Sequence, residues 1–343
     1  MNYLNKKFIK LKAKPKRWLI TGVAGFIGSN LLEALLASNQ KVVGVDNFVT
    51  GFRSNLTLVK LNVSKKQWSN FTLIKGSISN IQICKKACQK IDYVLHQAAI
   101  GSVPRSIKNP IDTNNSNVTG FLNMIVAAKE SKVKKFVYAS SSSVYGDNLT
   151  LPKIEKNIGS ALSPYAFTKQ INETYSRLFS KIYGLECTGL RYFNVFGKNQ
   201  NPNGDYAAVI PKWIIAMIQN KKITIYGDGN TTRDFCYIEN VIQANILAAT
   251  NSNQNNNSIY NVAVGNQISL NDLFLSIKKN LQINNIFYQK KPIYKSFRSG
   301  DIRHSLANIA KIKKELKYSP YQSFDTGICD LVPWYIKNQN SFL

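Results

Sequence analysis

The sequence has few of the residues from which proteins build histidine or cysteine sites. Its 343 residues include two histidines, His96 and His304, and five cysteines. Two histidines so far apart argue against a serine–histidine hydrolase or a histidine metal site. The cysteines have neither zinc nor redox spacing, and Cys84 and Cys88 lie one turn apart in a predicted helix. We therefore expect ordinary reduced thiols, no bound metal, and His96 as a core residue of a buried strand.

A membrane-spanning run of apolar residues is also missing. The longest apolar stretch, residues 18–37, is interrupted by glycine, serine, asparagine and glutamate, whereas a helix that crosses a membrane needs about 20 predominantly apolar residues. The basic segment 1–16 lacks the apolar core and cleavage site of a secretory signal peptide. We expect this segment to be a surface arm, and the protein to be cytoplasmic with no membrane partner.

Acidic residues are scarce: 18 Asp and Glu stand against 45 Lys and Arg, which gives a formal net charge of +27. Such an excess is typical of proteins that bind nucleic acid or anionic membranes. Here the positive residues are spread through every segment, and no recognised nucleic-acid motif is present. We favour compositional drift with a mild attraction for anionic ligands, and expect no nucleic-acid partner. A catalytically idle nucleotide-fold protein that binds nucleic acid is the alternative from another class.

Apolar runs alternate with amphipathic patterns along most of the chain. Strands are predicted within residues 17–25, 41–46, 71–76, 92–99, 134–141 and 187–197, and helices over 26–38, 120–132 and 169–184. Continuous apolar strands separated by helices indicate a parallel sheet covered on both faces. The predicted fold class is therefore α/β, a doubly wound parallel sheet of the Rossmann type.

A glycine-rich turn follows the first predicted strand. Gly22, Gly25 and Gly28 lie between that strand and a helix, where a backbone without side chains can approach a pyrophosphate at the helix N-terminus. Asp46 ends the next strand, and a carboxylate there can accept both ribose hydroxyls of an adenosine and repel a 2′-phosphate. The sequence therefore predicts NAD as the cofactor. The alternative is a structural turn with Asp46 as a surface cap.

The pattern changes after about residue 197. A polar loop over 199–207 precedes a helix over 208–219, a strand and turn over 223–229, and a low-complexity loop over 251–258. We expect an NAD-binding Rossmann domain over residues 1–190, with 1–16 as its basic arm. A smaller C-terminal substrate-binding α/β lobe over 191–343 is expected to be partly interleaved with it.

Tyr165 and Lys169 are four residues apart, so they share one face of a helix. A tyrosine that acts as a base at neutral pH needs its pKa lowered from ~10 by about 3, or roughly 4 kcal/mol. A positive charge about 4 Å away supplies on the order of 4 kcal/mol at an effective dielectric near 20. Lys169 together with an oxidised nicotinamide could therefore provide a phenolate that accepts a proton while hydride leaves the same carbon. Upstream, Ser140 to Ser143 end a strand, and one hydroxyl there could hold the substrate alcohol against Tyr165.

These residues lie within motifs that resemble the extended short-chain dehydrogenase/reductase family. The motifs are "TGVAGFIGS", "VVGVDNFVTG", "VLHQAA", "SSSSVYGD", "SPYAFTK", "RYFNVFG", "AAVIPKW", "GDGNTTRDFCYIENV" and "FRSGDIRHSLA". The resemblance runs from about residue 15 to 335. It is nearest to nucleotide-sugar 4-epimerases, particularly the bacterial enzymes of polysaccharide biosynthesis that interconvert UDP-N-acetylglucosamine and UDP-N-acetylgalactosamine.

The resemblance implies a mechanism. Tyr165 removes the C4 hydroxyl proton, Ser141 steers it, NAD takes the C4 hydride, the 4-keto sugar rotates, and the hydride returns to the other face. Dehydratases and decarboxylases of this family carry acidic residues directly after the position of Ser141, whereas this chain has Ser142 and Ser143. The resemblance therefore implies simple oxidation and re-reduction at C4.

The resemblance also implies the binding residues. For the cofactor they are Gly22, Gly25, Phe26, Ile27, Gly28, Asp46, Asn47, Ser77, Ile78, Gln97, Ala98, Ala99, Tyr165, Lys169 and Tyr192. For the UDP-sugar they are Gly101, Ser102, Ser141, Ser142, Asn194, Ala208, Val209, Tyr226, Arg233, Arg298, Asp301 and Ser305, with Arg233 and Arg298 as the cations on the two phosphates. Either arginine could instead form a structural ion pair.

Three residues bear on cofactor affinity and sugar choice. Ser77 stands where the family usually has an aspartate near the adenine, which implies weaker cofactor binding. Ser305 is small where some relatives carry tyrosine, which leaves room for an acetamido group. The runner-up function is a UDP-uronic acid 4-epimerase, in which arginines such as Arg105 would suit a carboxylate. Family precedent further implies a homodimer through helices near residues 110–130 and 165–183.

Overall fold

The computed structural model describes residues 11, 13–203, 207–251, 257–297 and 302–339. Its centre is a seven-stranded sheet in which every pairing is parallel. Across the sheet the strands are β11 (Asn257–Val262), β6 (Cys187–Tyr192), β5 (Lys135–Ser141), β4 (Tyr93–His96), β1 (Arg17–Thr21), β2 (Lys41–Asp46) and β3 (Phe71–Lys75). The order reverses between β1 and β4, and in such sheets ligands bind beyond the carboxyl ends of the strands at this point. The predicted Rossmann fold class is confirmed.

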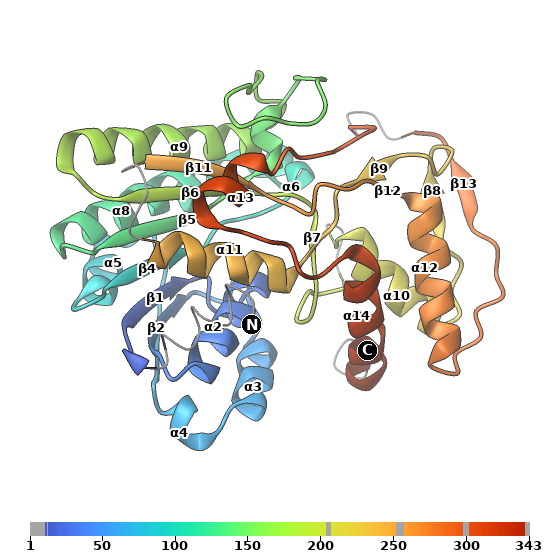
Figure 1. Cartoon of the computed structure of the whole chain (residues 1–343), viewed down its shortest axis with the longest axis horizontal. Helices are drawn as coiled ribbons and strands as arrows, with labels where there is room; N and C mark the ends of the chain where they lie inside the picture. The colour runs from blue at the N-terminus through green and yellow to red at the C-terminus, as the bar shows by residue number, and fades with distance from the viewer. Residues whose placement is uncertain (1–10, 12, 204–206, 252–256, 298–301, 340–343) are drawn as a thin grey trace.

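Helices cover both faces of this sheet (Figure 1). Those of the large domain are α2 (Phe26–Ala37), α3 (Arg53–Asn62), α4 (Lys65–Trp68), α5 (Ile81–Cys88), α6 (Val103–Lys108), α7 (Pro110–Asn114), α8 (Gly120–Glu130), α9 (Pro164–Tyr183), α11 (Ile238–Thr250) and α13 (Ala310–Leu316), with a π-helical turn η1 (Asn115–Thr119) and a 3₁₀ turn η2 (Ser142–Tyr145). Helices α2 and α11 contact one face, and α5, α8 and α9 lie on the other.

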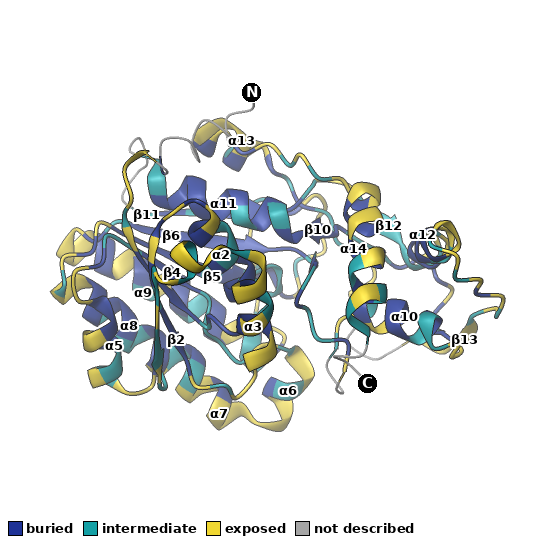
Figure 2. Cartoon of the chain, turned by 90° about the horizontal axis from the view of Figure 1, so that it is seen from below, coloured by how far each residue is buried: buried dark blue, intermediate teal, exposed yellow. Residues whose placement is uncertain are grey.

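Side chains of each strand alternate between two apolar cores because successive residues point to opposite faces. In β1, Trp18 and Ile20 join the core under α2 and α11, whereas Leu19 joins the core under α5 and α8. In β5, Val137 belongs to the first core and Phe136 to the second. Burial on both faces explains why the strand sequences are continuous apolar runs, and Figure 2 shows these strands as the buried centre of the domain.

The smaller lobe consists of three helices and short strand pairs beside the main sheet (Figure 1). Its elements are α10 (Val209–Ile218), α12 (Leu270–Ile283), α14 (Phe324–Asn338), β7 (Val195–Phe196) with β10 (Cys236–Tyr237), β8 (Thr224–Tyr226) with β13 (Ile293–Lys295), and β9 (Thr232–Arg233) with β12 (Ile268–Ser269). Helix α12 packs against α10 and α14.

The chain returns from this lobe to the large sheet. Strand β11 pairs with β6, and α11 packs against β4, β5 and β6. One expectation therefore needs correction, because the loop expected over 251–258 overlaps β11, which begins at Asn257. The domain boundary expected at residue 190 falls inside β6, and the division into two domains stays a prediction.

Other sequence expectations can be compared with the described residues. His96 is buried between Phe121 and Phe136, and its Nδ1 lies 2.9 Å from Thr21 Oγ1, so the prediction of a core histidine is confirmed. The five cysteines are free, and four of them are buried. No helix within the described ranges is both long and apolar enough to cross a membrane.

Candidate active site

The glycine turn after β1 passes close to the backbone after β4. Gly22 has a φ of +68°, and a Cβ there would lie 2.9 Å from Ala98 Cα. A Cβ on Gly28 would lie 2.1 Å from the carbonyl oxygen of Gly22. Both positions therefore require glycine, because any side chain would push the turn away from its neighbours. The result is a backbone cradle at the N-terminus of α2.

Asp46 ties this turn to the end of β2. Its two carboxylate oxygens accept hydrogen bonds from the backbone N–H groups of Ala24 and Phe48, both at 2.8 Å. A carboxylate oxygen has more than one lone pair, so each can still accept from a ribose hydroxyl. Asp46 thus shapes the turn and remains able to bind a diol.

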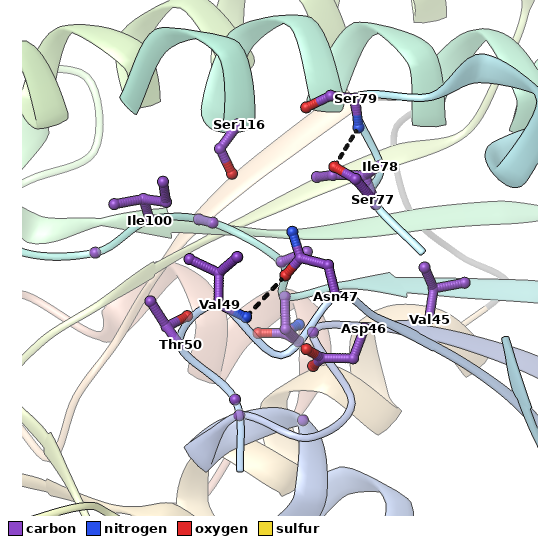
Figure 3. Close-up of a pocket in the computed structure, with 18 of the residues that line it drawn as sticks. Val45, Asp46, Asn47, Val49, Thr50, Ser77, Ile78, Ser79, Ile100 and Ser116 are labelled. Carbon is purple, nitrogen blue, oxygen red and sulfur yellow. Dashed lines mark hydrogen bonds between the residues drawn. The ribbon is translucent and has the colours of Figure 1, made fainter. Parts of the chain in front are cut away.

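A cavity of about 670 Å³ lies over this turn. Its lining includes twelve of the predicted cofactor residues, namely Gly22, Gly25, Phe26, Ile27, Gly28, Asp46, Asn47, Ser77, Ile78, Gln97, Ala98 and Ala99. Gly101, predicted for the substrate, also lines it. In Figure 3, Asp46 and Asn47 lie on one side of the cavity, and Ser77, Ile78 and Ser116 lie on the other. Ser77 Oγ accepts a hydrogen bond from the Ser79 N–H at 3.1 Å, so its own hydroxyl proton is left to donate.

Three of the predicted cofactor residues, Tyr165, Lys169 and Tyr192, do not line this cavity. The Tyr192 hydroxyl donates to Gln97 Oε1 at 3.0 Å. Asn245 Nδ2 on α11 donates to the same hydroxyl at 2.9 Å. Tyr192 therefore holds Gln97 and α11 together behind the cavity.

Tyr165 lies in the first turn of α9, which begins because Ser163 caps it and Pro164 fits the first helical position. Ser163 Oγ accepts from the Ala166 N–H at 3.1 Å, and Ser106 Oγ accepts from the Tyr165 N–H at 3.0 Å. A phenolate in this position benefits from the positive end of the helix dipole.

Ser141 stands at the end of β5, close enough to Tyr165 for its hydroxyl to favour the phenolate and so lower the pKa of the phenol. Its Oγ accepts from the Ser143 N–H at 3.1 Å and from Ser143 Oγ at 3.0 Å. With its acceptor sites filled in this way, the Ser141 hydroxyl proton is free to point at the phenol oxygen. Ser143 thus orients the predicted catalytic hydroxyl, a role that sequence reasoning did not assign.

Lys169 is buried one turn after Tyr165. Its Nζ donates to the Ala139 carbonyl at 2.8 Å and lies 5.8 Å from the centre of the Tyr165 ring. Burial lowers the pKa of Lys169 to about 8, and the nearby Glu173 carboxylate opposes that change. At pH 7 the amine is therefore mainly protonated.

The expected lowering of the Tyr165 pKa does not occur in the protein alone. Burial raises the pKa of Tyr165, and the hydrogen bond with Ser141 only partly opposes it. The prediction from the sequence assumed a cation about 4 Å from the phenol and did not include the loss of solvent around it. A phenolate at neutral pH therefore needs positive charge beyond that of Lys169.

Asn117 was missed by sequence reasoning. It lies in the π-helical turn η1, where its side chain accepts from the Ile100 N–H at 2.7 Å and donates to the Ile100 carbonyl at 3.0 Å. It also donates to Thr168 Oγ1 at 3.2 Å. Asn117 therefore ties the segment after β4 to α9, and so holds the cofactor cavity next to Tyr165. A π-helical turn is not visible in a hydrophobic pattern.

A second cavity of about 600 Å³ lies at the smaller lobe. Four predicted substrate residues line it, namely Asn194, Val209, Tyr226 and Arg233. The lining also contains residues that were not predicted, including Lys212, Trp213, Lys222, Phe297 and Arg303. Arg303 forms an exposed ion pair of 2.8 Å with Asp228, and Arg233 Nη1 donates to the carbonyls of Thr232 and Arg303. The cavity thus combines cations with aromatic rings.

The remaining predicted substrate residues lie in several places. Ser102 caps α6 by accepting from the Arg105 N–H at 3.3 Å, and Ser142 is half-buried in η2. Ala208 is exposed at the start of α10. The Ser305 N–H donates to the Thr232 carbonyl at 3.2 Å, beside the strand that carries Arg233. Arg298 and Asp301 lie outside the described residues.

Asp234 connects the segments around the second cavity. Its carboxylate is fully buried and accepts from the N–H groups of Val264 at 3.0 Å, Gly265 at 3.1 Å and Ala307 at 3.2 Å. Burial raises the pKa of Asp234 to about 6, while these backbone donors oppose the rise. Because Arg233 and Phe235 flank this anchor and line the cavity, Asp234 fixes their position.

Comparison with known proteins assigns the chain to a family. A model of the NAD dependent epimerase/dehydratase family matches residues 18–263. The chain belongs to this family. The resemblance inferred from the sequence motifs is thereby confirmed, and NAD is the cofactor of the family.

Several known members are similar over almost their whole length. A putative UDP-glucose 4-epimerase of Methanocaldococcus jannaschii is 34% identical over 94% of this chain and 99% of its own. The UDP-N-acetylglucosamine 4-epimerase of Methanobrevibacter ruminantium, solved with UDP-N-acetylmuramic acid, is 37% identical with a TM-score of 0.85, over 95% of this chain and 99% of its own. The UDP-glucuronic acid 4-epimerase of Bacillus cereus, solved with UDP-glucuronic acid and NAD, is 31% identical with a TM-score of 0.82, over 94% of this chain and 99% of its own.

The first cavity fits NAD by its own geometry. Gly22 and Gly28 leave the cradle that a Cβ would fill, and Asp46 stands at the end of the next strand. A pyrophosphate suits the exposed N–H groups at the start of α2, and the diol of an adenosine ribose suits Asp46. The residues that line the first cavity of this chain therefore fit NAD, the cofactor of its family.

The cradle generates a first testable prediction. In Gly28→Ala, the new Cβ would overlap the Gly22 carbonyl, so α2 must shift and the pyrophosphate loses its backbone donors. We expect NAD affinity to fall at least about tenfold, or ~1.4 kcal/mol, as measured by isothermal titration calorimetry. Ala37→Ser, at the exposed far end of α2, serves as the control. An unchanged affinity in a folded Gly28→Ala protein would contradict this role of the turn.

Proposed function

We propose that the protein is an NAD-dependent 4-epimerase that interconverts UDP-N-acetylglucosamine and UDP-N-acetylgalactosamine. The observation that carries the proposal is the placement of Tyr165 on α9 near Ser141, with the buried Lys169 one turn away and α9 joined through Asn117 to the segment that lines the cofactor cavity. The residues after Ser141 also support it. Ser143 orients Ser141, and neither Ser142 nor Ser143 offers a carboxyl group for elimination or for chemistry at another carbon.

The proposed mechanism assigns each residue one task. Ser141, whose acceptor sites are filled by Ser143, donates to the C4 oxygen and aligns it with Tyr165. Tyr165 takes the hydroxyl proton and later returns it. NAD, when bound, would supply hydride chemistry at C4, and its oxidised nicotinamide would bring positive charge to the site. That charge would oppose the effect of burial, which raises the pKa of Tyr165. Lys169, held by the Ala139 carbonyl, adds a second positive charge.

The nucleotide must stay fixed while the sugar rotates. We assign the uridine diphosphate to the second cavity, where Arg233 and Arg303 provide cations and Tyr226 and Phe297 provide rings. A guanidinium can bind phosphate oxygens in a bidentate manner. The small side chain of Ser305, next to the strand of Arg233, supports an acetamido sugar over a plain hexose.

A UDP-uronic acid 4-epimerase is the second candidate. The similarity to the Bacillus cereus enzyme solved with UDP-glucuronic acid supports it. Lys212, Lys222 and Arg303 in the second cavity would also suit an additional negative charge, as would Arg105 on α6. The two candidates share the chemistry at C4 and differ only in the group recognised on the sugar.

The sugar preference can be tested directly. Purified protein should convert UDP-N-acetylglucosamine to UDP-N-acetylgalactosamine without added reductant, with a kcat/KM at least about tenfold above that for UDP-glucose or UDP-glucuronic acid. Liquid chromatography of the nucleotide sugars measures this. Ser305→Tyr should reduce the rate with the acetamido sugar more than that with UDP-glucose. A higher kcat/KM for the uronate would select the second candidate.

The role of Tyr165 gives a separate prediction. Tyr165→Phe removes the proton acceptor and leaves the ring in place, so kcat should fall by roughly 10²–10⁴-fold. NAD binding and the circular dichroism spectrum should stay close to those of the unchanged protein. Tyr183→Phe, the same change at an exposed position of the same helix, controls for substitution on α9. Full turnover in Tyr165→Phe would exclude the proposed chemistry.

We also propose that the protein is a homodimer through α9 and the neighbouring helices. Phe167, Leu178 and Ile182 are exposed on α9 and fall within about 60° of one another around the helix. Ile107 on α6 and Ile111 on α7 are exposed as well, and both helices pack against α9. An apolar surface of this kind is typical of a protein interface.

Light scattering after size-exclusion chromatography tests the dimer. The unchanged chain should elute at about twice 38.6 kDa, and Ile182→Asp should shift it to the monomer mass, since a charge at an apolar interface is unfavourable. Ile283→Asp is the matched control, because this isoleucine is 65% exposed on α12 against 63% for Ile182. A monomeric unchanged protein, or identical masses for both variants, would argue against this interface.

A further inference from the structure

A buried ion pair lies behind Lys169 and has no part in the mechanism above. Glu173 on α9 and Arg191 on β6 are only 3% and 2% exposed. Arg191 donates to the two carboxylate oxygens of Glu173 from Nε and Nη2, both at 2.8 Å. Burying such a pair removes two ions from water, so a pair of this kind is weak evidence for a stabilising role alone.

The carboxylate of Glu173 contacts the end of β5, next to the residues that meet both catalytic side chains. Ser140 Oγ donates to Glu173 Oε1 at 2.6 Å. Ser140 lies between Ala139, whose carbonyl accepts from Lys169, and Ser141, whose hydroxyl lowers the pKa of Tyr165. Glu173 therefore holds the end of β5 at the point where it meets both catalytic side chains.

Glu173 also continues the row of catalytic residues along α9. Tyr165, Lys169 and Glu173 follow one another at intervals of four, so they stand on one side of the helix. Arg191 holds the carboxylate from the opposite side, and its Nη1 donates to the Glu155 carbonyl at 2.8 Å. The carboxylate is thus fixed one turn beyond the amine of Lys169.

We infer that Glu173 is a positioning residue for the proposed epimerase reaction. Its carboxylate holds the end of β5 in place and keeps Lys169 protonated. Arg191 fixes the Glu173 carboxylate in the orientation that serves both tasks. The inference rests on the proposed function for its effect on turnover, but the protonation of Lys169 can be measured without any reaction.

The charges around Lys169 determine its protonation. On α9 it is flanked by the Tyr165 phenol and by Glu173; on β4 it faces His96, whose pKa burial lowers to about 3. β5 contributes the Ala139 carbonyl, and Arg191 of β6 is paired with Glu173. His96 is therefore neutral and Arg191 is positive. Glu173 supplies the negative charge that opposes the effect of burial on Lys169.

Glu173→Gln tests the inference because it keeps the shape and removes the charge. In the cofactor-bound enzyme, we expect the alkaline limb of the kcat/KM pH profile to move to lower pH by about 1 pH unit. In the protein without cofactor, ¹⁵N-lysine NMR should report the same fall for the Lys169 resonance, assigned with Lys169→Met. Glu173→Asp retains the charge and should leave the limb near its original pH even if turnover is lower.

Two further variants keep the test decisive. Glu186→Gln removes a half-exposed glutamate that pairs with Lys135, and should change neither the limb nor the Lys169 resonance. Glu173→Gln could fail to fold because Arg191 is left unpaired. In that case Glu173→Gln/Arg191→Gln removes both charges and should still lower the pKa of Lys169. If the Glu173–Arg191 pair were purely structural, Glu173→Gln would reduce activity at every pH and leave the pKa of Lys169 unchanged. This result would overturn the inference. If the unchanged protein fails to epimerise while Glu173→Gln still lowers the pKa of Lys169, the proposed function is contradicted and the inference about Lys169 stands.

Discussion

The close approach of two backbone segments, one leaving β1 and one leaving β4, is the constraint on which the site depends. Gly22 comes so near to Ala98 that a Cβ would not fit. This contact exists because β1 and β4 are neighbours at the point where the strand order reverses. It places the glycine cradle, Asp46 at the end of β2 and the segment after β4 around a single cavity.

Polar side chains fix α9 and the substrate side of the site relative to the cofactor cavity. Asn117 binds the backbone of Ile100 and the hydroxyl of Thr168, so the cofactor cavity and α9 keep a fixed relation. On the substrate side, Asp234 binds three backbone N–H groups from two separate segments. Neither side chain needs to touch a ligand, yet each determines where ligand-binding groups stand.

Much of the large domain could be predicted from the sequence because its signals are local. The apolar runs gave β1 to β6, and the sequence Ser163–Pro164 marks the start of α9 through its cap. Strand β11 was missed because its first residues continue an asparagine-rich stretch and its partner, β6, is distant in the chain. Pairing between distant strands depends on how their side chains are buried against neighbouring elements, so it cannot be predicted from the sequence of either strand alone.

The candidate site was predicted unevenly for similar reasons. The glycines, Asp46, Tyr165 and Lys169 stand at fixed spacings, so their grouping could be foreseen. Lys212 and Lys222 could not be separated from the many other lysines, and Asn117 acts through a π-helical turn. The pKa of Tyr165 is expected to fall under Lys169 and the oxidised nicotinamide together, whereas burial raises it in the protein without cofactor. The sequence shows which charge is near the phenol and not how much water is removed from it.

The return of the chain to the large sheet has a consequence for synthesis. Strand β11 covers the outer edge of β6 only after the whole segment between them has been made. On the ribosome, the growing protein therefore exposes an uncovered strand edge and the apolar face under α11 until residue 262 has emerged. The sheet is therefore completed late, although every residue that lines the cofactor cavity precedes residue 117.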